Sequence, residues 1–418
     1  MEESAVMNID RGSNIRRYMA EVKKITCVPK EVPLFSVIVL TYMQRHLLEP
    51  CIDSILIQDY PNIEIIISDD CSADFNPDEV RSYILNRRGR NIRNIIVVKQ
   101  TENVGTSKNA RLGIQLASGV FFKLHAGDDM LYSQSVLSMM AKYLKKPSVN
   151  IIAARSRACQ HDGTMTEEVY PAYDAISKMM DANAQEQFEM MATQSWGEYI
   201  NAPAVFWRRD FYEKIGGFDP KYKYTEDWPM WLKITKAGYR ITSVNELSTI
   251  YRYGGISNDQ SDINASLGKE HYDECIRMLE EEALPVFQQK HQKMKGLRCK
   301  QAIWCIQARI ICETQWNHWS VLQKVIWKCQ NAKQLLLAWL YRRRTWGTNI
   351  SVYKEIIAAL GIGVFYHFHI QLWPVLEFDT FWALLFFVVL AFLALKIAIL
   401  LSVKCVIKII PFIKRGKK

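Results

Sequence analysis

Short apolar runs alternate with helical patterns between residues 35 and 130. The apolar runs lie at residues 35–40, 64–68, 94–99 and 120–124. Between them, apolar positions recur at the spacing of three and four residues that marks a helix face, over residues 46–58, 77–87 and 105–117. Continuous apolar runs are typical of strands buried on both faces. The alternation therefore predicts an α/β fold with a Rossmann-like, mostly parallel sheet flanked by helices.

Polar side chains follow three of the predicted strands. Thr41 and Tyr42 follow the first strand, Asp70 the second, and the pair Asp128 and Asp129 the fourth. Ligands of such sheets collect at the carboxyl ends of the strands. An aromatic ring beside a carboxylate suits a flat heterocycle, because the ring stacks and the acid accepts a ring N–H. The alternatives are ordinary packing for Tyr42 and a helix cap or Asx-turn for Asp70.

The adjacent acids Asp128 and Asp129 are a candidate site for a hard cation. Neighbouring side chains of a strand point to opposite faces, so the chain must turn at Gly127 if both acids are to face one ligand. Carboxylates hold Mg²⁺ or Mn²⁺ when substrate phosphates complete the coordination. The alternative is a polar turn without a ligand.

Charge is unevenly distributed along the 418 residues. The net charge is +10, but residues 291–418 hold 19 Lys and Arg against 4 Asp and Glu, whereas residues 1–290 hold 34 against 39. This asymmetry argues against nucleic acid as a partner of the first part and favours contact of the basic part with an anionic surface. The ten cysteines form no CxxC pair, which favours a reduced, cytosolic setting. Residues 1–34 contain no apolar, signal-like run and are expected to be a lead-in segment.

Several ordered motifs resemble glycosyltransferase family 2, the inverting transferases of the GT-A fold. The motifs are SVIVLTY at 36–42, ISDDCSAD at 67–74, ENVG at 102–105, GIQLASGVFFKLHAGDDM at 113–130 and GGFD at 216–219. The resemblance covers about residues 35–255 and suits the bacterial polysaccharide, O-antigen or capsule enzymes. It implies transfer from a nucleotide-diphosphate sugar, a UDP-sugar first among them, to a hydroxyl of a lipid-linked or polysaccharide acceptor. The absence of a Gln-x-x-Arg-Trp sequence makes the processive synthases a poor match.

The resemblance also implies roles for the residues at the strand ends. Thr41, Tyr42 and Asp70 would line the nucleobase site. Asp128 would lie by the ribose or sugar, and Asp129 would be the main ligand of Mg²⁺ or Mn²⁺, with Asp128 beside it.

Three positions depart from the family pattern. Cys71 stands where the family usually has glycine, and Ala126 replaces an acid two residues before Asp128, which leaves fewer protein ligands for the metal. Arg111, the candidate nucleotide-facing arginine, stands one residue later than usual.

A second acid pair, Glu226 and Asp227, precedes Pro229. Proline is well suited to the first position of a helix, which would place both acids beside the helix amino end, where ionised carboxylates are favoured. Helix capping is the alternative to a catalytic role. The resemblance makes Asp227 the general base and lets Glu226 orient it or cap the helix. Arg252, in the Tyr251 to Ser257 segment, would contact the diphosphate, with a surface salt bridge as the alternative.

Residues 160–195 are polar and give few signals, so that an acceptor loop and a solvated surface insertion are both open. Residues 261–355 are expected to be helical and rich in basic residues and tryptophan, a combination that favours a lipid headgroup zone but also fits a helical core. Residues 356–418 contain two apolar stretches, 356–376 and 381–403. Their alternatives are a membrane hairpin, interfacial helices and a soluble helical core.

The sequence thus predicts a lead-in (1–34), a GT-A domain (35–260), a helical region (261–355) and a membrane-associated end (356–418). The enzyme would work at the cytoplasmic face of the bacterial inner membrane. A nucleotidyltransferase of related fold and a membrane-tethered sugar-nucleotide-binding protein with a degenerate site are the alternatives. The transferase interpretation requires Asp70, Asp128, Asp129 and Asp227 to meet at one cleft, with Asp129 accessible to solvent.

Overall fold

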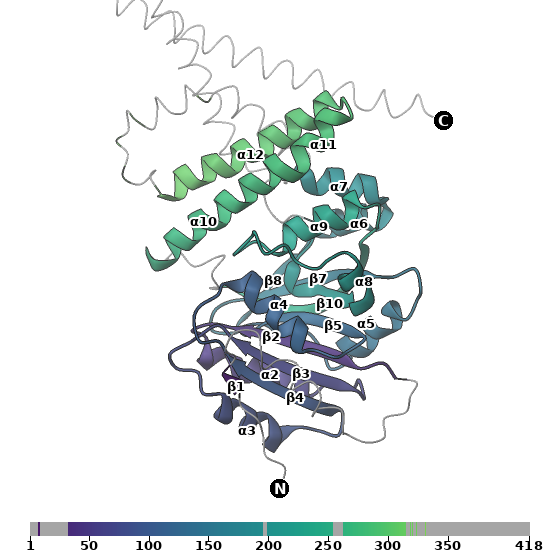
Figure 1. The fold of residues 1–418 in the computed structure, drawn as a ribbon, viewed down its shortest axis with the longest axis vertical. Coiled ribbons are helices and arrows are strands. Elements are labelled where there is room, and N and C mark those ends of the chain that lie inside the picture. Colours follow the sequence, from purple (N-terminus) through teal and green to yellow (C-terminus); the bar gives the residue numbers. More distant parts are fainter. Residues whose placement is uncertain are drawn as a thin grey trace, which may run out of the picture. The chain divides into compact units, whose positions relative to one another are not determined.

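The computed structural model describes residues 7–8, 32–194, 199–253 and 262–314, together with residues 318, 320, 323 and 331. The chain divides into two compact units, Met1–Thr314 and Gln315–Lys418, and all elements below belong to the first (Figure 1). The apolar stretches at 356–376 and 381–403 lie outside the described residues. Of the helices that the structure describes, none combines the length and the apolar character needed to span a bilayer.

The first half of the sheet is parallel. Strands β1 (Met7–Asn8), β4 (Ile92–Lys99), β3 (Ile63–Asp69), β2 (Phe35–Thr41) and β5 (Phe121–Ala126) lie side by side in this order, and every neighbouring pair is parallel. All seven residues of β3 are buried, as a strand covered on both faces requires. The four strands predicted from apolar runs are confirmed to within two residues at each end.

The second half of the sheet is mixed. Strand β9 (Val205–Arg208) lies antiparallel between β5 and β7 (Ile151–Cys159). Strand β10 (Thr242–Arg252) runs parallel to β7, while β6 (Met130–Leu131) pairs antiparallel with β10 and β8 (Met165–Tyr170) with β7. The prediction of a mostly parallel sheet therefore holds for the first half only.

Helices cover both faces of the parallel strands. Helices α2 (Arg45–Leu56), α3 (Pro77–Arg87) and α5 (Val136–Leu144) share one hydrophobic cluster with Ile65 of β3, whereas α4 (Thr106–Leu116) shares another with the adjacent Ile66. Alternate residues of each strand thus enter different cores, which explains why the sequence shows continuous apolar runs instead of alternation.

Residues 160–195 contain more regular structure than their polar character predicted. Besides β8 they form α6 (Tyr173–Asp181) and α7 (Ala184–Ala192). Each helix buries a pair of apolar side chains three residues apart, and these pairs are Ile176 with Met179 and Phe188 with Met191. Gln187 on α7 is fully buried and bonds the backbone of Met179 and of Ile241, which fixes both helices to the start of β10.

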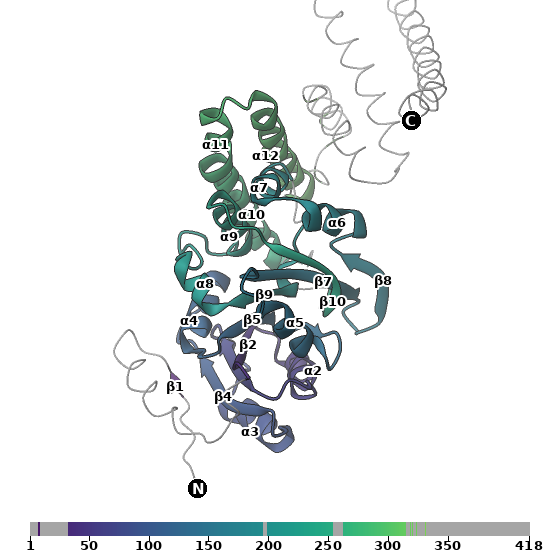
Figure 2. The ribbon, with the colours of Figure 1, turned by 90° about the vertical axis from the view of Figure 1, so that its right-hand side faces the viewer.

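The chain ends its first unit in helices. Helices α8 (Arg209–Lys214) and α9 (Asp227–Lys236) precede β10, and α10 (Asp262–Met278), α11 (Leu284–Gln289) and α12 (Lys293–Thr314) follow it. Figures 1 and 2 show α10 to α12 stacked near α7 and α9, at the end of the unit away from β3 and β4.

The predicted domain boundary at residue 260 falls inside one compact unit. Met278, Phe287 and Ile303 of the last three helices lie in the same hydrophobic cluster as Phe188 of α7. Because they share a core with the sheet domain, the helices up to Thr314 belong to it, and the first unit ends there.

Candidate active site at the carboxyl ends of the strands

Asp70 joins three segments at the end of β3. Its backbone N–H donates to the carbonyl of Thr41 (2.9 Å), and its two carboxylate oxygens accept the backbone N–H groups of Val104 (2.8 Å) and Gly105 (2.9 Å). Asp70 is 4% exposed, and its pKa is raised by burial against the lowering effect of these hydrogen bonds. The structure therefore brings Thr41 and Asp70 together, as the sequence predicted.

The neighbouring acid, Asp69, has a local structural role. It accepts the backbone N–H (2.8 Å) and the hydroxyl (2.6 Å) of Ser72, and the same hydroxyl accepts the backbone N–H of Met43 (2.7 Å). Met43 and Cys71 both have positive φ, at 54° and 70°. Side chains other than glycine are strained there, and such strain gathers at functional sites. Cys71 thus adopts the conformation for which the family uses glycine.

The turn at Gly127 directs both acids of the second cluster. Strand β5 ends at Ala126, and the N–H of Asp129 donates back to the Ala126 carbonyl at 3.2 Å. A Cβ at Gly127 would lie 3.0 Å from the Cβ of Thr41 and 3.2 Å from the carbonyl oxygen of Leu40. Glycine is therefore required for the turn to pack this closely against the end of β2, and the predicted turn is confirmed.

Asp128 and Asp129 are held by two residues from distant parts of the chain. Gln44, just before α2, donates its side-chain amide to Asp128 Oδ2 at 3.1 Å, and the backbone N–H of Arg252 donates to Asp129 Oδ1 at 2.9 Å. Asp129 is 1% exposed and Asp128 7%. The expectation that Asp129 reaches solvent is therefore wrong, because Arg252 on β10 covers it. The more accessible acid is Asp128.

The buried pair carries an electrostatic cost. Burial, followed by repulsion from Asp128, raises the pKa of Asp129 well above its ordinary value, and burial raises that of Asp128. The nearby Lys123 of β5 is fully buried, and burial lowers its pKa to about 7 despite the attraction of Asp129. A cation at the pair would offset the repulsion.

One oxygen of the pair could serve as a cation ligand. Oδ2 of Asp129 is buried and has no hydrogen-bond partner among the described residues, whereas buried polar groups are normally satisfied. Among the described residues no three His, Cys, Asp or Glu side chains group together as a metal site. The residues present thus fit a divalent ion that takes two protein carboxylates and completes its coordination on substrate phosphates.

Arg252 is part of the site instead of a surface ion pair. It is 6% exposed, and its guanidinium donates to the backbone carbonyls of Asp128 (3.0 Å) and His161 (2.7 Å). The surface salt bridge that the sequence left open is therefore wrong. Arg252 fixes the acid turn and places a positive charge beside Asp128, where it opposes the rise in that pKa.

Glu226 and Asp227 stand at the amino end of α9, but in a different register from the prediction. The helix begins at Asp227, two residues earlier than expected, so Pro229 is its third residue, and the side chain of Glu226 makes no capping hydrogen bond. Burial and the charge of Asp227 raise the pKa of Glu226 to about 8. Burial also raises the pKa of Asp227, while His271 opposes this shift.

Lys223 ties the loop before α9 to the Asp70 side of the site. Its carbonyl accepts the N–H of Ser107 at 3.2 Å, and its side chain lies so close to Gly105 that an added Cβ there would meet it at 2.7 Å. Its ammonium also lowers the pKa of Asp70. The Asp227 loop and Asp70 therefore flank the same loop at the amino end of α4.

Tyr42 and Arg111, both predicted to bind the nucleotide, differ in their surroundings. The Tyr42 ring is 38% exposed and is available for stacking. Arg111 donates to the carbonyl of Phe218 in the GGFD turn, so the described contacts place it against that turn and not against the acids. Gln44 was not found by sequence reasoning, because a lone glutamine at a loop carries no pattern.

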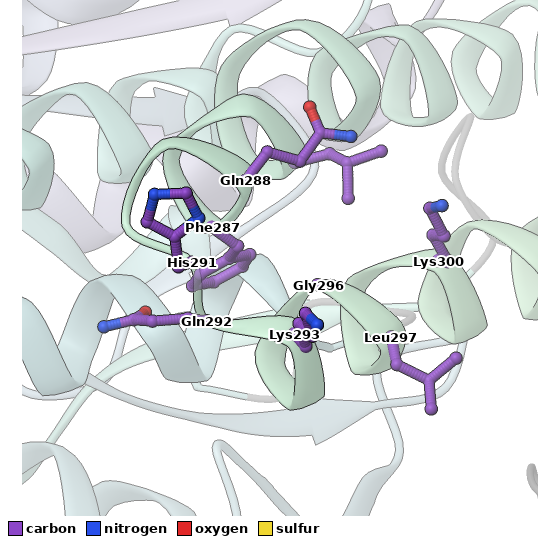
Figure 3. Close-up of a pocket in the computed structure, with 9 residues that line it drawn as sticks. Phe287, Gln288, His291, Gln292, Lys293, Gly296, Leu297 and Lys300 are labelled. Atoms are coloured by element: carbon purple, nitrogen blue, oxygen red, sulfur yellow. The ribbon is translucent and has the colours of Figure 1, made fainter.

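A cavity lies away from the acid site. A pocket of about 370 Å³ opens between α11 and α12, where Phe287 lines it together with His291 and Lys300 (Figure 3). Its walls contain no carboxylate, so it belongs to a different surface from the acid site.

An α/β sheet with acids at the carboxyl ends of its strands is an architecture in which ligands bind at those ends. Residues 36–216 match the family model for glycosyl transferase family 2. The resemblance found in the sequence is therefore confirmed over these residues.

Several curated relatives are glycosyltransferases. The uncharacterized glycosyltransferase EpsJ of Bacillus subtilis is 26% identical over 222 residues, which cover 53% of this chain and 61% of EpsJ. The GalNAc(5)-diNAcBac-PP-undecaprenol beta-1,3-glucosyltransferase of Campylobacter jejuni is 35% identical over 111 residues, 27% of this chain and 35% of that one. The chain matches about three-fifths of the length of the first relatives.

Among solved structures, residues 1–349 of TarS from S. aureus align with 72% of this chain and 80% of that one, at 16% identity and a TM-score of 0.48. The mannosyltransferase PcManGT of Pyrobaculum calidifontis aligns with 84% of this chain and 93% of its own, at 20% identity and a TM-score of 0.45.

Proposed function

We propose that the chain is an inverting glycosyltransferase that moves a sugar from a nucleotide-diphosphate sugar to a hydroxyl of a lipid-linked or polysaccharide acceptor. Two observations carry the proposal, in a chain whose residues 36–216 match the family. Asp70 and the Asp128 turn lie against the end of β2, and the loop before Asp227 contacts the amino end of α4 beside Asp70. The acceptor follows from the undecaprenol-linked substrate in the name of the Campylobacter jejuni relative.

In this proposal the nucleotide lies across the ends of β2 and β3. The exposed Tyr42 ring stacks on the base, and the carboxylate of Asp70, fixed by two backbone N–H groups, accepts a base N–H. Because Thr41 supports both Asp70 and the Gly127 turn, the base site and the acid pair keep a fixed spacing.

Asp128 and Asp129 would hold Mg²⁺ or Mn²⁺, which stabilises the charge that grows on the leaving diphosphate. The buried Asp129 supplies its unpartnered Oδ2 from behind, and the less buried Asp128 faces the substrate. Gln44 and Arg252 orient the pair by the hydrogen bonds described above.

Asp227 would accept the proton of the attacking acceptor hydroxyl. Its raised pKa makes it a stronger base than an exposed aspartate, and at pH values where Glu226 is protonated the pair carries a single negative charge. One in-line displacement at the anomeric carbon then inverts its configuration.

The Asp227→Asn substitution tests this assignment. Loss of a positioned base typically lowers the rate by about 10² to 10⁴, so kcat should fall by that factor while nucleotide binding is kept. The matched control is Glu213→Gln, which removes a carboxylate that is 66% exposed. Wild-type turnover by the Asp227→Asn variant would contradict the role of Asp227.

A donor screen tests the reaction itself. The purified full chain in detergent would be mixed with UDP- and GDP-sugars with and without Mn²⁺, and followed by thermal stabilisation, nucleoside diphosphate release and the anomeric configuration of the product. Diphosphate release with transfer supports the proposal. Pyrophosphate release from a nucleoside triphosphate would indicate a nucleotidyltransferase. Stabilisation without turnover would indicate a degenerate binding protein, an alternative favoured by the burial of Asp129.

For the place of action, we propose the cytoplasmic face of the bacterial inner membrane, on the strength of the apolar and basic sequence of residues 356–418.

A further inference from the structure

Three successive backbone N–H groups of the loop before α9 converge on one side chain of α10. Glu274 Oε1 accepts from Lys223 at 2.7 Å, and Oε2 accepts from Tyr224 at 2.9 Å and from Thr225 at 3.0 Å. The Glu274 side chain is only 12% exposed. A carboxylate thus fixes the backbone of this loop at three consecutive residues, two residues before Asp227.

A second contact of α10 reaches the same loop. The hydroxyl of Thr225 lies 2.8 Å from Nδ1 of His271, one turn before Glu274 on α10. Thr225 is 1% exposed. The last loop residue before the acid pair is therefore held by α10 through both its backbone and its side chain.

We propose that Glu274 is a positioning residue for Asp227, through which α10 sets the orientation of the catalytic base. The inference rests on the proposed function of Asp227 as the base. It assigns a role in catalysis to a helix that lies after residues 36–216, the part matched by the family model.

The chemistry of the contact separates glutamate from its closest analogue. All three partners are donors, so both side-chain oxygens must accept. In a Glu274→Gln variant one oxygen becomes an amide NH₂, which cannot accept from Lys223, or from Tyr224 and Thr225, depending on the amide orientation. The loop then loses at least one of the three bonds without losing side-chain volume.

The experiment compares kcat and the donor KM of Glu274→Gln and wild type in the full chain. Misplacement of a reacting group by about 1 Å lowers the rate by about 10²-fold, so kcat should fall by about 10- to 100-fold while the donor KM stays within about threefold, because the donor contacts on β2, β3 and β5 are untouched. Glu274→Asp, which keeps two accepting oxygens on a shorter side chain, should recover part of kcat.

The matched control is Glu282→Gln. Glu282 lies in the π-helical segment Leu279–Ala283 between α10 and α11 and contacts the same loop, but through the exposed ammonium of Lys221 at 2.9 Å. The Glu282→Gln substitution removes one negative charge from the same region but no hydrogen bond to the backbone of the loop, so kcat should be unchanged.

The pH profile adds a readout that a merely structural role would not move. The groups that face the Glu226 and Asp227 pair are Glu274, His271 and Cys275 of α10 and Tyr212 of α8. Glu226 and Asp227 repel each other, so the acid limb of kcat reports the loss of the first proton from the pair. Glu274→Gln removes a negative charge that raises the pKa of Glu226, so this limb should move to lower pH. Glu282→Gln should leave the limb in place.

A folded Glu274→Gln variant with wild-type kcat and pH profile would overturn the inference. Failure of both Glu274 variants to fold would also overturn it, because Glu274 would then be a structural residue. The Asp227→Asn variant in the same assay separates the two proposals. If Asp227→Asn turns over normally, the base assignment fails. If Asp227→Asn is impaired but the Glu274 variants turn over normally, the base assignment stands and only the positioning role of Glu274 is refuted.

Discussion

Asp129 combines burial, a neighbouring negative charge and an oxygen without a partner. Each feature is unfavourable in the absence of a cation, and each becomes favourable when one is bound. The strain at Met43 and Cys71 lies at the neighbouring strand ends. At the scale of single residues, several unfavourable features thus lie where the substrate is proposed to bind, as is common at functional sites.

Substitution of Asp129 by asparagine tests the cation. Asn can still accept the Arg252 N–H through its oxygen, while the repulsion from Asp128 disappears. We expect Asp129→Asn to melt at the same or a higher temperature than wild type without metal, but to lose the thermal stabilisation that Mn²⁺ with a nucleotide gives to wild type. Equal stabilisation of both proteins by Mn²⁺ would contradict a role of Asp129 in metal binding.

Gly127→Ala tests the close packing of the acid turn. The added methyl would approach Thr41 at 3.0 Å and the rigid Leu40 backbone at 3.2 Å, so the turn has to shift. Small-to-large changes in packed sites typically cost about 1–3 kcal/mol. We expect a lower melting temperature and weaker nucleotide binding, measured by calorimetry. As a control, Gly238→Asn on the surface has free space around its Cβ and a positive φ that Asn tolerates.

Several site residues were predictable from the sequence because they follow strands. Asp70, Asp128 and Asp129 directly succeed apolar runs, and a sheet brings such ends together. Glu274 could not be found in this way, because its partners are backbone N–H groups, which are the same for every sequence. The contact of Gln44 with Asp128 and that of the Arg252 N–H with Asp129 could not be predicted either, because both depend on the tertiary fold.

At the scale of elements, the quality of prediction follows the strength of the apolar pattern. Strands β2 to β5 and helices α2 to α4 were expected within a few residues, because each is covered by a large core. The start of α9 was displaced because Pro229 is tolerated throughout the first turn of a helix, where its missing N–H has no partner to lose. Helices α6 and α7 were missed because each buries only a narrow stripe.

The amino end of α9 predicts a dependence on pH. The base must be ionised, and burial raises the pKa of Asp227 above its ordinary value, so kcat should rise with pH and its acid limb should lie at higher pH than for an exposed aspartate. In Glu226→Gln the repulsion between the two acids is gone, so the acid limb should move to lower pH.

The free energy of unfolding should fall with rising pH, whereas kcat rises. The folded pKa of Glu226, about 8, lies above its ordinary value of 4.5, so the folded state binds this proton more tightly. The contribution of Glu226 to the free energy of unfolding therefore falls as pH rises from about 4.5 to about 8. Denaturant titrations at pH 5 and pH 8 should show this decline in wild type and a smaller decline in Glu226→Gln. Identical declines would mean that Glu226 titrates normally.

At the scale of the whole molecule, the sequence and the structure divide the chain at different places. The sequence places a domain boundary at residue 260 and a change of charge at about residue 290, but the shared core extends the first unit to Thr314. A change of composition marks the start of a helical segment, whereas a domain boundary depends on which residues pack together, and the sequence does not reveal this.

A shortened chain tests the membrane prediction. The apolar stretches 356–376 and 381–403 lie after Thr314, so a chain that ends there should lose any attachment that they provide. We expect the full chain to sediment with membranes at high salt, and the chain ending at Thr314 to stay in the supernatant. Co-sedimentation of both would place the attachment in residues 1–314.

The bonds of Arg252 also bear on how the site can evolve. Among the described residues, its guanidinium donates to two main-chain oxygens, so descendants of this gene can replace the histidine at 161 without losing that link. The N–H that holds Asp129 is likewise supplied by whatever residue stands at 252. Mutational drift should therefore be wide at 161 and narrow at 129, and a lineage that replaces Arg252 should need a new cation beside Asp128.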